Sequence, residues 1–423
     1  MKIALTLLVI VSIARNTYFS SAYIDVLRGG VLLLVSAMAF IKLVPIMSFR
    51  IIKGYWSLLG YALAVLFSVI DTKDTVFVLF HAVSIASIIL FSIACYESKT
   101  SSLINSTLFA TIFWCYLALI IVSLMVLMIN PQLVYDTIDF SEKRFRGVLP
   151  TAGMMGGVGA VLLGIALFVK GNVVIRAVAI ISSIVCVGLT QSRTFWVAFV
   201  VASFVTQFLF LKKGRLVGTA AVLVIMLVGL ASLALKVNIN INTKGANDFM
   251  RVETITNLTG RVALWDKAIS MALERPFFGF GVTAGSNVFN NDDEQQMLFN
   301  GDDTIESARR AGKSTMHNGY LQSLLDVGLI GTFFYLSMIL GSISSMFRYD
   351  HSRKYSAELF LLVFLSVANL TENVIYSVTV FNSALFFILA GFAAHLRFMT
   401  ERSAPSKSPV RLRFTQMGKE NSI

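Results

Sequence analysis

The sequence predicts an all-α polytopic membrane protein of about twelve transmembrane helices, with one large outer loop between helices 9 and 10. Of the 423 residues, 56% are hydrophobic and only 14% are charged, whereas about one quarter of the residues in a soluble domain are charged. Apolar runs of about 17 or more residues recur along nearly the whole chain, and each can cross a hydrocarbon core of about 30 Å as a helix. This composition excludes a water-soluble fold.

The apolar runs define the helices, and the basic residues decide their orientation. Lys and Arg cluster after the second, sixth, eighth and tenth helices and in the C-terminal tail, so the positive-inside rule makes that side cytoplasmic and places both termini there. Lys2 precedes the first run as in a signal peptide, but no small-residue cleavage site clearly follows, and we expect a retained first helix. The expected spans are 3–14, 27–46, 55–70, 75–95, 107–129, 150–169, 173–190, 194–211, 216–236, 317–347, 355–370 and 375–396.

Four parts follow from these spans. Residues 1–236 carry helices 1–9, residues 237–316 form the outer loop, residues 317–396 carry helices 10–12, and residues 397–423 are a basic cytoplasmic tail. Within the loop, apolar residues from Val262 to Glu274 recur at helical spacing, which predicts a half-buried amphipathic helix that Pro276 closes. The loop is the one large soluble piece of the chain.

Charge and cysteine content exclude several other classes. The formal net charge of +12 comes with no nucleic-acid-binding motif, and topology explains the basic residues better. Cys95, Cys115 and Cys186 all fall inside apolar runs, where a thiol behaves as a small hydrophobe. No cluster has the spacing of a zinc or calcium site, and we expect neither a metal nor a cofactor.

Two arginines stand out on the predicted outer face. Arg193 lies between helices 7 and 8 with almost no loop to hold it in water; it is either an interfacial anchor or a ligand-binding group. Arg261 opens the helix in the outer loop, where a helix N-terminus beside a cation is suited to an anion, although a solvated charge is the simpler explanation. Arg251 and Arg275 are weaker candidates of the same kind. Arg144 and Arg146 add positive charge on this face, where solvation in an acidic loop is the favoured explanation.

One histidine stands at the mouth of the outer loop. His317 and Asn318 begin the tenth helix, and Gly328 and Gly331 follow in it. A histidine in this position is either an interfacial residue or a base that works near neutral pH. The two glycines have a packing explanation, because they allow close helix approach.

Together these residues resemble the bacterial O-antigen ligase family. The likeness covers essentially the whole chain, and its sharpest part is His317-Asn318, nine residues, Gly328, two residues, Gly331, which is similar to that family's histidine motif. Arg193 and Arg261 fall where the family has its functional arginines. The related O-antigen polymerases share the topology and much of the loop, so ligase and polymerase both stay open.

The resemblance implies an O-antigen ligase of the bacterial inner membrane, with its active site facing the periplasm. Such an enzyme is a metal-independent, inverting glycosyltransferase that moves a polysaccharide from undecaprenyl diphosphate to a sugar hydroxyl of the lipid A-core. In it His317 is the general base, Arg193 and Arg261 bind the donor diphosphate, and Asn318, Arg146 and Arg275 are supporting residues. The implied partners are the lipid-linked donor, the lipid A-core acceptor and membrane lipids, with no nucleic acid.

Two other classes predict different patterns. A flippase or transporter also has about twelve helices, but we expect internal repeats and broken polar helices near its midplane, and the sequence shows neither. A purely structural membrane protein gives no reason for two arginines and a histidine to gather at one face.

Overall fold

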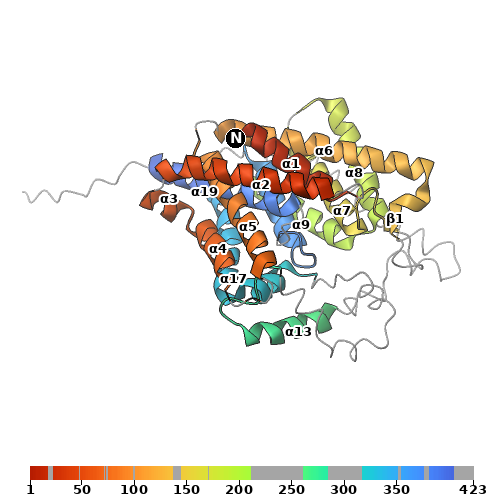
Figure 1. Cartoon of the computed structure of the whole chain (residues 1–423). Helices are drawn as coiled ribbons and strands as arrows, with labels where there is room; N and C mark the ends of the chain where they lie inside the picture. The colour runs from red at the N-terminus through yellow and green to blue at the C-terminus, as the bar shows by residue number, and fades with distance from the viewer. Residues whose placement is uncertain are drawn as a thin grey trace, which may run out of the picture.

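The computed structural model describes residues 1–17, 22–46, 48–70, 72, 75–98, 101–136, 144–169, 171–210, 261–283, 317–350, 354–375 and 381–403. Almost all regular structure in these ranges is helical (Figure 1). The one sheet described is a short antiparallel pair, β1 (Tyr135–Asp136) and β2 (Arg144–Phe145). The predicted all-α class is confirmed.

Nine helices precede the outer loop in the described residues. They are α1 (Lys2–Arg15), α2 (Ala22–Leu43), α3 (Phe49–Gly54), α4 (Trp56–Phe67), α5 (Thr75–Tyr96), α6 (Ser101–Ile129), α7 (Ala152–Phe168), α8 (Val173–Thr190) and α9 (Arg193–Phe210). Short 3-10 turns, Val44–Ile46 and Pro131–Val134, follow α2 and α6. After them come α13 (Arg261–Glu274), α17 (Gly319–Tyr349), α18 (Ser356–Ala368) and α19 (Phe381–Ser403).

Membrane-spanning character is evident from length and composition. Every predicted span except 216–236, which lies outside the described residues, coincides with a helix. Six described segments are long and apolar enough to cross a membrane, and they are Val26–Ile46, Thr75–Tyr96, Ile104–Ile129, Val173–Thr190, Gly319–Tyr349 and Phe381–Arg402. The chain is therefore a polytopic membrane protein, while the count of twelve and the four-part division stay predictions. The loop helix, predicted at 262–274, is α13.

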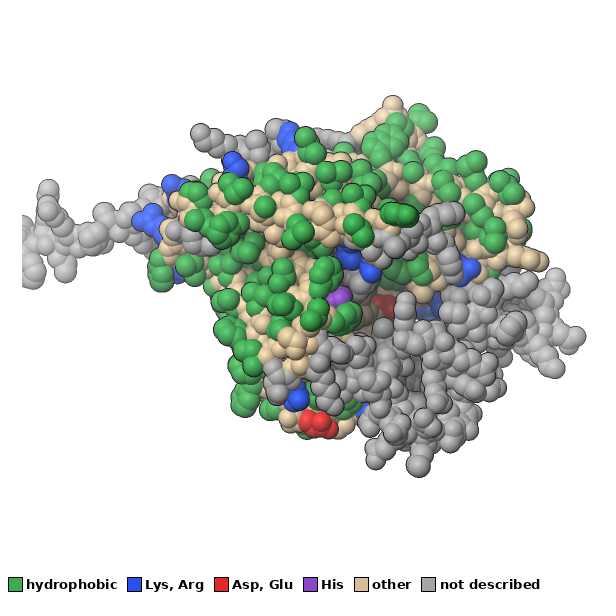
Figure 2. Space-filling view, viewed as in Figure 1, with side chains coloured by type: hydrophobic (Ala, Val, Ile, Leu, Met, Phe, Trp, Pro, Cys, Tyr) green, Lys and Arg blue, Asp and Glu red, His purple; other side chains and the backbone are tan. Residues whose placement is uncertain are grey.

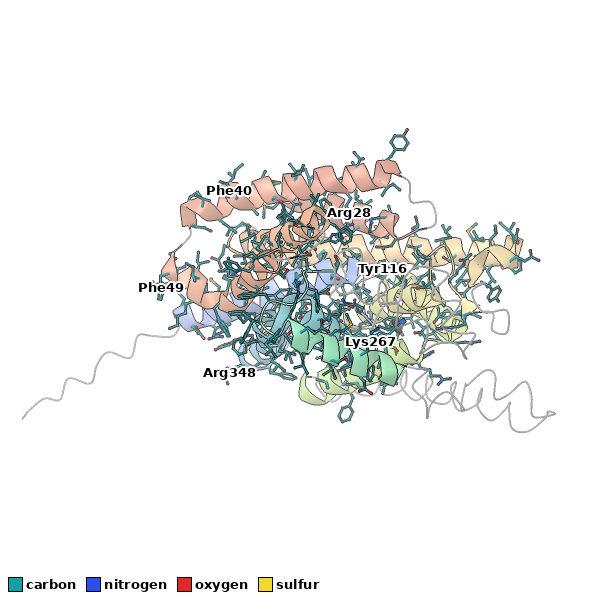
Figure 3. The ribbon with its side chains drawn as sticks, turned by 60° about the horizontal axis from the view of Figure 1, so that its bottom comes forward. Arg28, Phe40, Phe49, Tyr116, Lys267 and Arg348 are labelled. Carbon is teal, nitrogen blue, oxygen red and sulfur yellow. The ribbon has the colours of Figure 1, made fainter. Side chains whose placement is uncertain are left out.

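The surface separates an apolar belt from a basic end. Hydrophobic side chains cover the face over α1, α2 and α6, and Lys and Arg gather at the left-hand end, where α3 and α19 lie (Figure 2). Phe40 of α2 and Phe49 of α3 point outward and are 69% and 81% exposed, whereas Arg28 of α2 is buried on the inner side (Figure 3). The outward phenylalanines suit contact with lipid.

The helix α18 forms the centre of the core. Every residue from Ser356 to Leu365 is buried, and Phe360 and Phe364 stack with ring centroids 5.9 Å apart. Phe195 of α9 packs on Phe364 at 6.0 Å, and Gly164 of α7 leaves room for the Phe360 ring, which a Cβ there would strike. A helix that is apolar on nearly all sides lies either inside protein or against lipid, and α18 lies inside the protein.

Two helices differ from the prediction, one by an internal break and one by its starting residue. The tenth span, 317–347, was expected as one helix, but Gly328 breaks α17 with φ 65° and ψ −168°. The Leu329 N–H bonds the Pro276 carbonyl at 2.7 Å, so the segment after α13 supplies the acceptor that a continuous helix would supply. The packing explanation for Gly328 was therefore incomplete, because this backbone conformation is essentially restricted to glycine.

The last helix begins later than its predicted start at residue 375. The Oδ1 of Asn369 accepts hydrogen bonds from the backbone N–H groups of Val374 and Ile375, at 3.2 and 3.0 Å. This side-chain bonding holds the chain in a turn after α18. Residue 375 is therefore outside the helix, and α19 is Phe381–Ser403.

Candidate functional site

The site is built around His317, directly before α17. Its Nδ1 lies 3.2 Å from Oε2 of Glu372, and the two side chains are 41% and 26% exposed. A carboxylate only accepts hydrogen bonds, so Nδ1 carries the hydrogen and donates it. In the neutral ring Nε2 then holds the lone pair and is the atom able to take a proton.

Asn318 caps the helix that follows. Its Oδ1 accepts hydrogen bonds from the backbone N–H groups of Tyr320 and Leu321, at 3.0 and 3.1 Å. The cap fixes where α17 begins and so fixes His317, whose φ of 47° is unusual for a residue other than glycine. Asn318 thus positions the histidine through the backbone.

Asn369 ties the two halves of α17 to the end of α18. Its carbonyl accepts from the Gly319 N–H at 2.9 Å, and its Nδ2 donates to the Tyr335 hydroxyl at 2.9 Å. A Cβ at residue 319 would collide with the Asn369 side chain, so only glycine fits there. This junction brings the start of α17 against the turn that carries Glu372.

The helix that Arg193 begins, α9, contacts the same turn. Arg193 is the first residue of that helix and is exposed, and its neighbour Thr194 accepts a hydrogen bond from the Thr371 hydroxyl at 2.9 Å. Gln191 ends α8 in the left-handed conformation, with φ 52°, so α9 starts almost at once. The turn therefore contacts His317 through Glu372, and it contacts the first turn of α9 through Thr371.

For Arg261, the structure describes the position of the backbone but not of the side chain. Arg261 is the first residue of α13, and its side chain lies outside the described residues. Ala268, Met271 and Ala272 of α13 pack on Leu325 in the first half of α17. The helix α13, which begins at Arg261, is thus packed against the first half of α17, which follows His317.

The two arginines expected to be supporting residues have local contacts. Arg146 donates from Nη2 to the Leu133 carbonyl at 3.4 Å, and the Arg275 guanidinium lies 5.1 Å from the centre of the Phe280 ring. These contacts join the residues that flank β1 and β2 and fix the segment after α13, and neither is made to His317 or Glu372.

A small cavity of about 120 Å³ adjoins the turn. Glu372 and Asn373 form part of its wall, which is otherwise mainly apolar; among its other residues are Ile13, Tyr116, Leu149, Met154, Phe195 and Asn382. In the part of the chain described, no group of three His, Cys, Asp or Glu side chains is arranged to hold a metal ion.

Sequence reasoning missed Glu372, Thr371 and Asn369. The available signal was a run of polar residues, Thr371 to Asn373, directly after an apolar helix and with little room for a solvated loop. Their pairing with His317, Thr194 and Tyr335 joins segments far apart in the chain.

The fold and this polar turn define a class: a polytopic membrane protein whose ionisable groups meet at the ends of short apolar helices. Residues 177–336 match the sequence model of the O-antigen ligase family. The match covers most of α8, all of α9 and α13 and the first part of α17, including Arg193, Arg261 and His317. It confirms the predicted resemblance to the O-antigen ligase family over these residues. A comparison with curated proteins finds no match.

Proposed function

We propose that this protein is an O-antigen ligase of the bacterial inner membrane. It would transfer a polysaccharide from undecaprenyl diphosphate to a sugar hydroxyl of the lipid A-core on the periplasmic face. The family match supports the ligase and polymerase superfamily as a whole. The observation that best supports glycosyl transfer is the His317–Glu372 pair beside the N-terminus of α9.

In the proposed reaction His317 is the general base. Its Nε2 takes the proton of the acceptor hydroxyl as that oxygen attacks the anomeric carbon of the donor sugar. The new glycosidic bond forms while the bond from the anomeric carbon to the diphosphate oxygen breaks, and the configuration inverts. Glu372 stabilises the imidazolium that results, because its carboxylate is already bonded to Nδ1.

The leaving diphosphate needs positive charge. Arg193, at the start of α9, adds its guanidinium to the positive end of the helix dipole, an arrangement suited to a phosphate oxygen. Arg261 holds the corresponding position on α13. A planar guanidinium forms two parallel hydrogen bonds to such a group, which a point charge cannot do.

The depth of the turn suits a lipid-linked donor. The helix α18 has 13 residues, which is about 20 Å at a rise of 1.5 Å per residue, whereas the hydrocarbon core is about 30 Å thick. If α18 starts at the cytoplasmic surface, Glu372 lies below the outer surface, near the level of a membrane-embedded diphosphate. The cavity beside Glu372 then lies next to the bond that breaks.

A polymerase using the same donor type is the alternative, and one experiment separates the two. The gene is deleted and the lipopolysaccharide is run on a gel. A ligase predicts loss of all O-antigen-capped core, whereas a polymerase predicts core that carries a single repeat unit. Unchanged lipopolysaccharide would contradict both.

An assay of glycosyl transfer by the purified protein then tests whether His317 is the general base. With lipid-linked donor and lipid A-core acceptor, His317→Ala is expected to lose most transfer and to keep donor affinity. Loss of donor affinity as well would place His317 in the diphosphate site, and another group would have to take the proton.

A further inference from the structure

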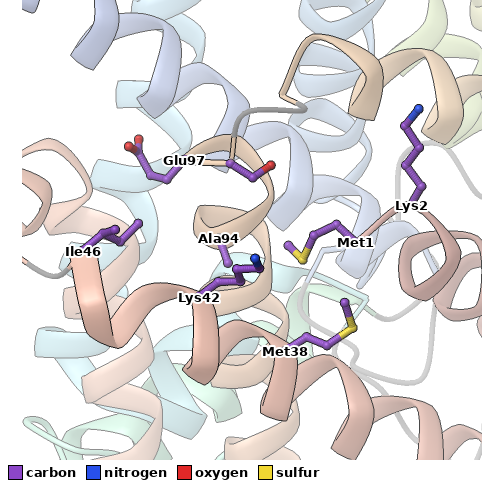
Figure 4. A pocket seen from close by; sticks show the side chains of 8 residues that line it. Met1, Lys2, Met38, Lys42, Ile46, Ala94 and Glu97 are labelled. Carbon is purple, nitrogen blue, oxygen red and sulfur yellow. The ribbon is translucent and has the colours of Figure 1, made fainter.

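A second, larger pocket lies at the other end of the helix bundle. Its volume is about 560 Å³, and it lies between the start of α1, the end of α2 and the end of α5. The segment after α13 packs at the opposite end of α5, where Gly281 approaches Val78. The pocket is lined by Met1, Lys2, Met38, Lys42, Ile46, Ala94, Glu97 and Ser98 (Figure 4).

Two lysines give this pocket its charge. Lys2 and Lys42 are both exposed, and within the described ranges neither ammonium group has a hydrogen-bond or ion-pair partner. The Lys42 side chain reaches the middle of the pocket beside Met1 and Met38, while the Glu97 carboxylate lies to one side (Figure 4). The Lys42 ammonium therefore lies among the lining side chains, whereas the Lys2 side chain extends away from them at the rim (Figure 4). No described neighbour compensates either charge.

The one carboxylate in the lining is engaged elsewhere. Oε1 of Glu97 accepts a hydrogen bond from the Tyr55 hydroxyl at 2.6 Å and another from Nδ1 of His395 at 3.0 Å. Burial raises the pKa of Glu97, but the bonds from His395 and Tyr55 outweigh it and hold that pKa below its ordinary value. Glu97 thus links α5 to α19 and the start of α4, and is not a counter-ion for the two lysines.

The remaining wall is apolar and continues onto the outer surface. Met38 lies in the pocket, and Leu34 and Ile41 lie four residues before and three residues after it on the same face of α2. Leu34 is 45% exposed and Ile41 67%. A stripe of exposed apolar side chains therefore leads from the lysines along α2, and flexible methionine adapts to chains of varied shape.

We propose that this pocket binds an anionic phospholipid of the cytoplasmic leaflet. Lys42 takes the headgroup phosphate, Lys2 adds positive charge at the rim, and the stripe on α2 takes an acyl chain. The cytoplasmic leaflet is rich in anionic lipid, and basic pockets between membrane helices on that side bind such headgroups. A soluble phosphate would gain nothing from the apolar wall. The inference uses the orientation predicted from the basic residues and is independent of the proposed glycosyl transfer.

Lipid binding to the purified full-length protein tests the proposal. Native mass spectrometry in a neutral detergent measures the affinity for dioleoyl phosphatidylglycerol and, separately, for dioleoyl phosphatidylcholine. The phosphatidylglycerol is expected to bind more tightly. Lys2→Gln and Lys42→Gln should each weaken its binding about fivefold, the change expected from one basic group near the headgroup. Lys53→Gln, an exposed lysine on α3 at the same end, is the matched control and should bind like the unchanged protein.

Two results would overturn the proposal. The first is equal phosphatidylglycerol affinity in the Lys2→Gln/Lys42→Gln double variant and the Lys53→Gln control. The second is displacement of the lipid by an equal concentration of sn-glycerol 3-phosphate, because the pocket would then be a site for soluble phosphate esters. Melting curves without added lipid show whether the variants are folded; equal midpoints together with the loss of phosphatidylglycerol binding support the proposal.

Discussion

Glu372 offers the sharpest test of the proposed chemistry, because sequence reasoning did not find it. Glu372→Gln keeps the size of the side chain and an oxygen able to accept the hydrogen of His317 Nδ1, but removes the negative charge. We expect a lower kcat with little change in donor affinity. The ring stays oriented while the imidazolium formed during transfer loses its counter-charge.

The size of the loss follows from the geometry. Nδ1 and Oε2 are 3.2 Å apart, and the side chains are 41% and 26% exposed, so water screens the pair. Coulomb's law at that separation gives about 1.3 kcal/mol for an effective dielectric constant of about 80 and about 2.6 kcal/mol for about 40. At 1.36 kcal/mol for each tenfold change in rate, kcat should fall about 10- to 100-fold.

The assay is glycosyl transfer by purified protein, with donor affinity measured separately. Glu401→Gln is the control, because Glu401 pairs with Arg397 at the far end of α19 and should leave kcat unchanged. If Glu372 acts through His317, the His317→Ala/Glu372→Gln double variant should be no slower than His317→Ala. Full activity of Glu372→Gln, or additive losses in the double variant, would refute the reasoning.

Four further predictions follow. His317→Ala should slow transfer about 10²- to 10⁴-fold in the same assay, and a normal rate would make the residue merely interfacial. Arg193→Ala and Arg261→Ala should each abolish transfer while the protein stays in the membrane. Lysine at either position should restore only part of the activity, because an ammonium group cannot form the two parallel hydrogen bonds of a guanidinium. Normal transfer by either alanine variant would make that arginine an interfacial anchor. Gly328→Ala should destabilise the protein by about 1–3 kcal/mol in a melting experiment, because a side chain is strained at φ 65° and would strike the Phe277 backbone. The control is Gly341→Ala, at a helical glycine with open space around it, which should have little effect. Equal melting midpoints for the two variants would contradict the strain assigned to Gly328. A reporter fused after Asn290 should be active only outside the cytoplasm and one after Arg353 only inside, and the reverse pattern would overturn the site assignment.

The sequence by itself determined the fold class and most of the helix positions. The bilayer requires long apolar runs whose backbone groups are satisfied within each helix, so the spans are visible as composition. The helix in the outer loop was also predictable, because its apolar spacing is local. The motif that begins at His317 was enough to predict the family, which the match over residues 177–336 confirms.

Only the tertiary structure decided what surrounds His317. Glu372 lies 55 residues further along the chain, and Thr371 contacts Thr194 across 177 residues; no periodicity in the sequence encodes such pairs. The break at Gly328 was hidden for the same reason, because the carbonyl that bonds the Leu329 N–H belongs to Pro276. Local sequence sets which groups need partners, and the packing of distant segments decides which partners they find.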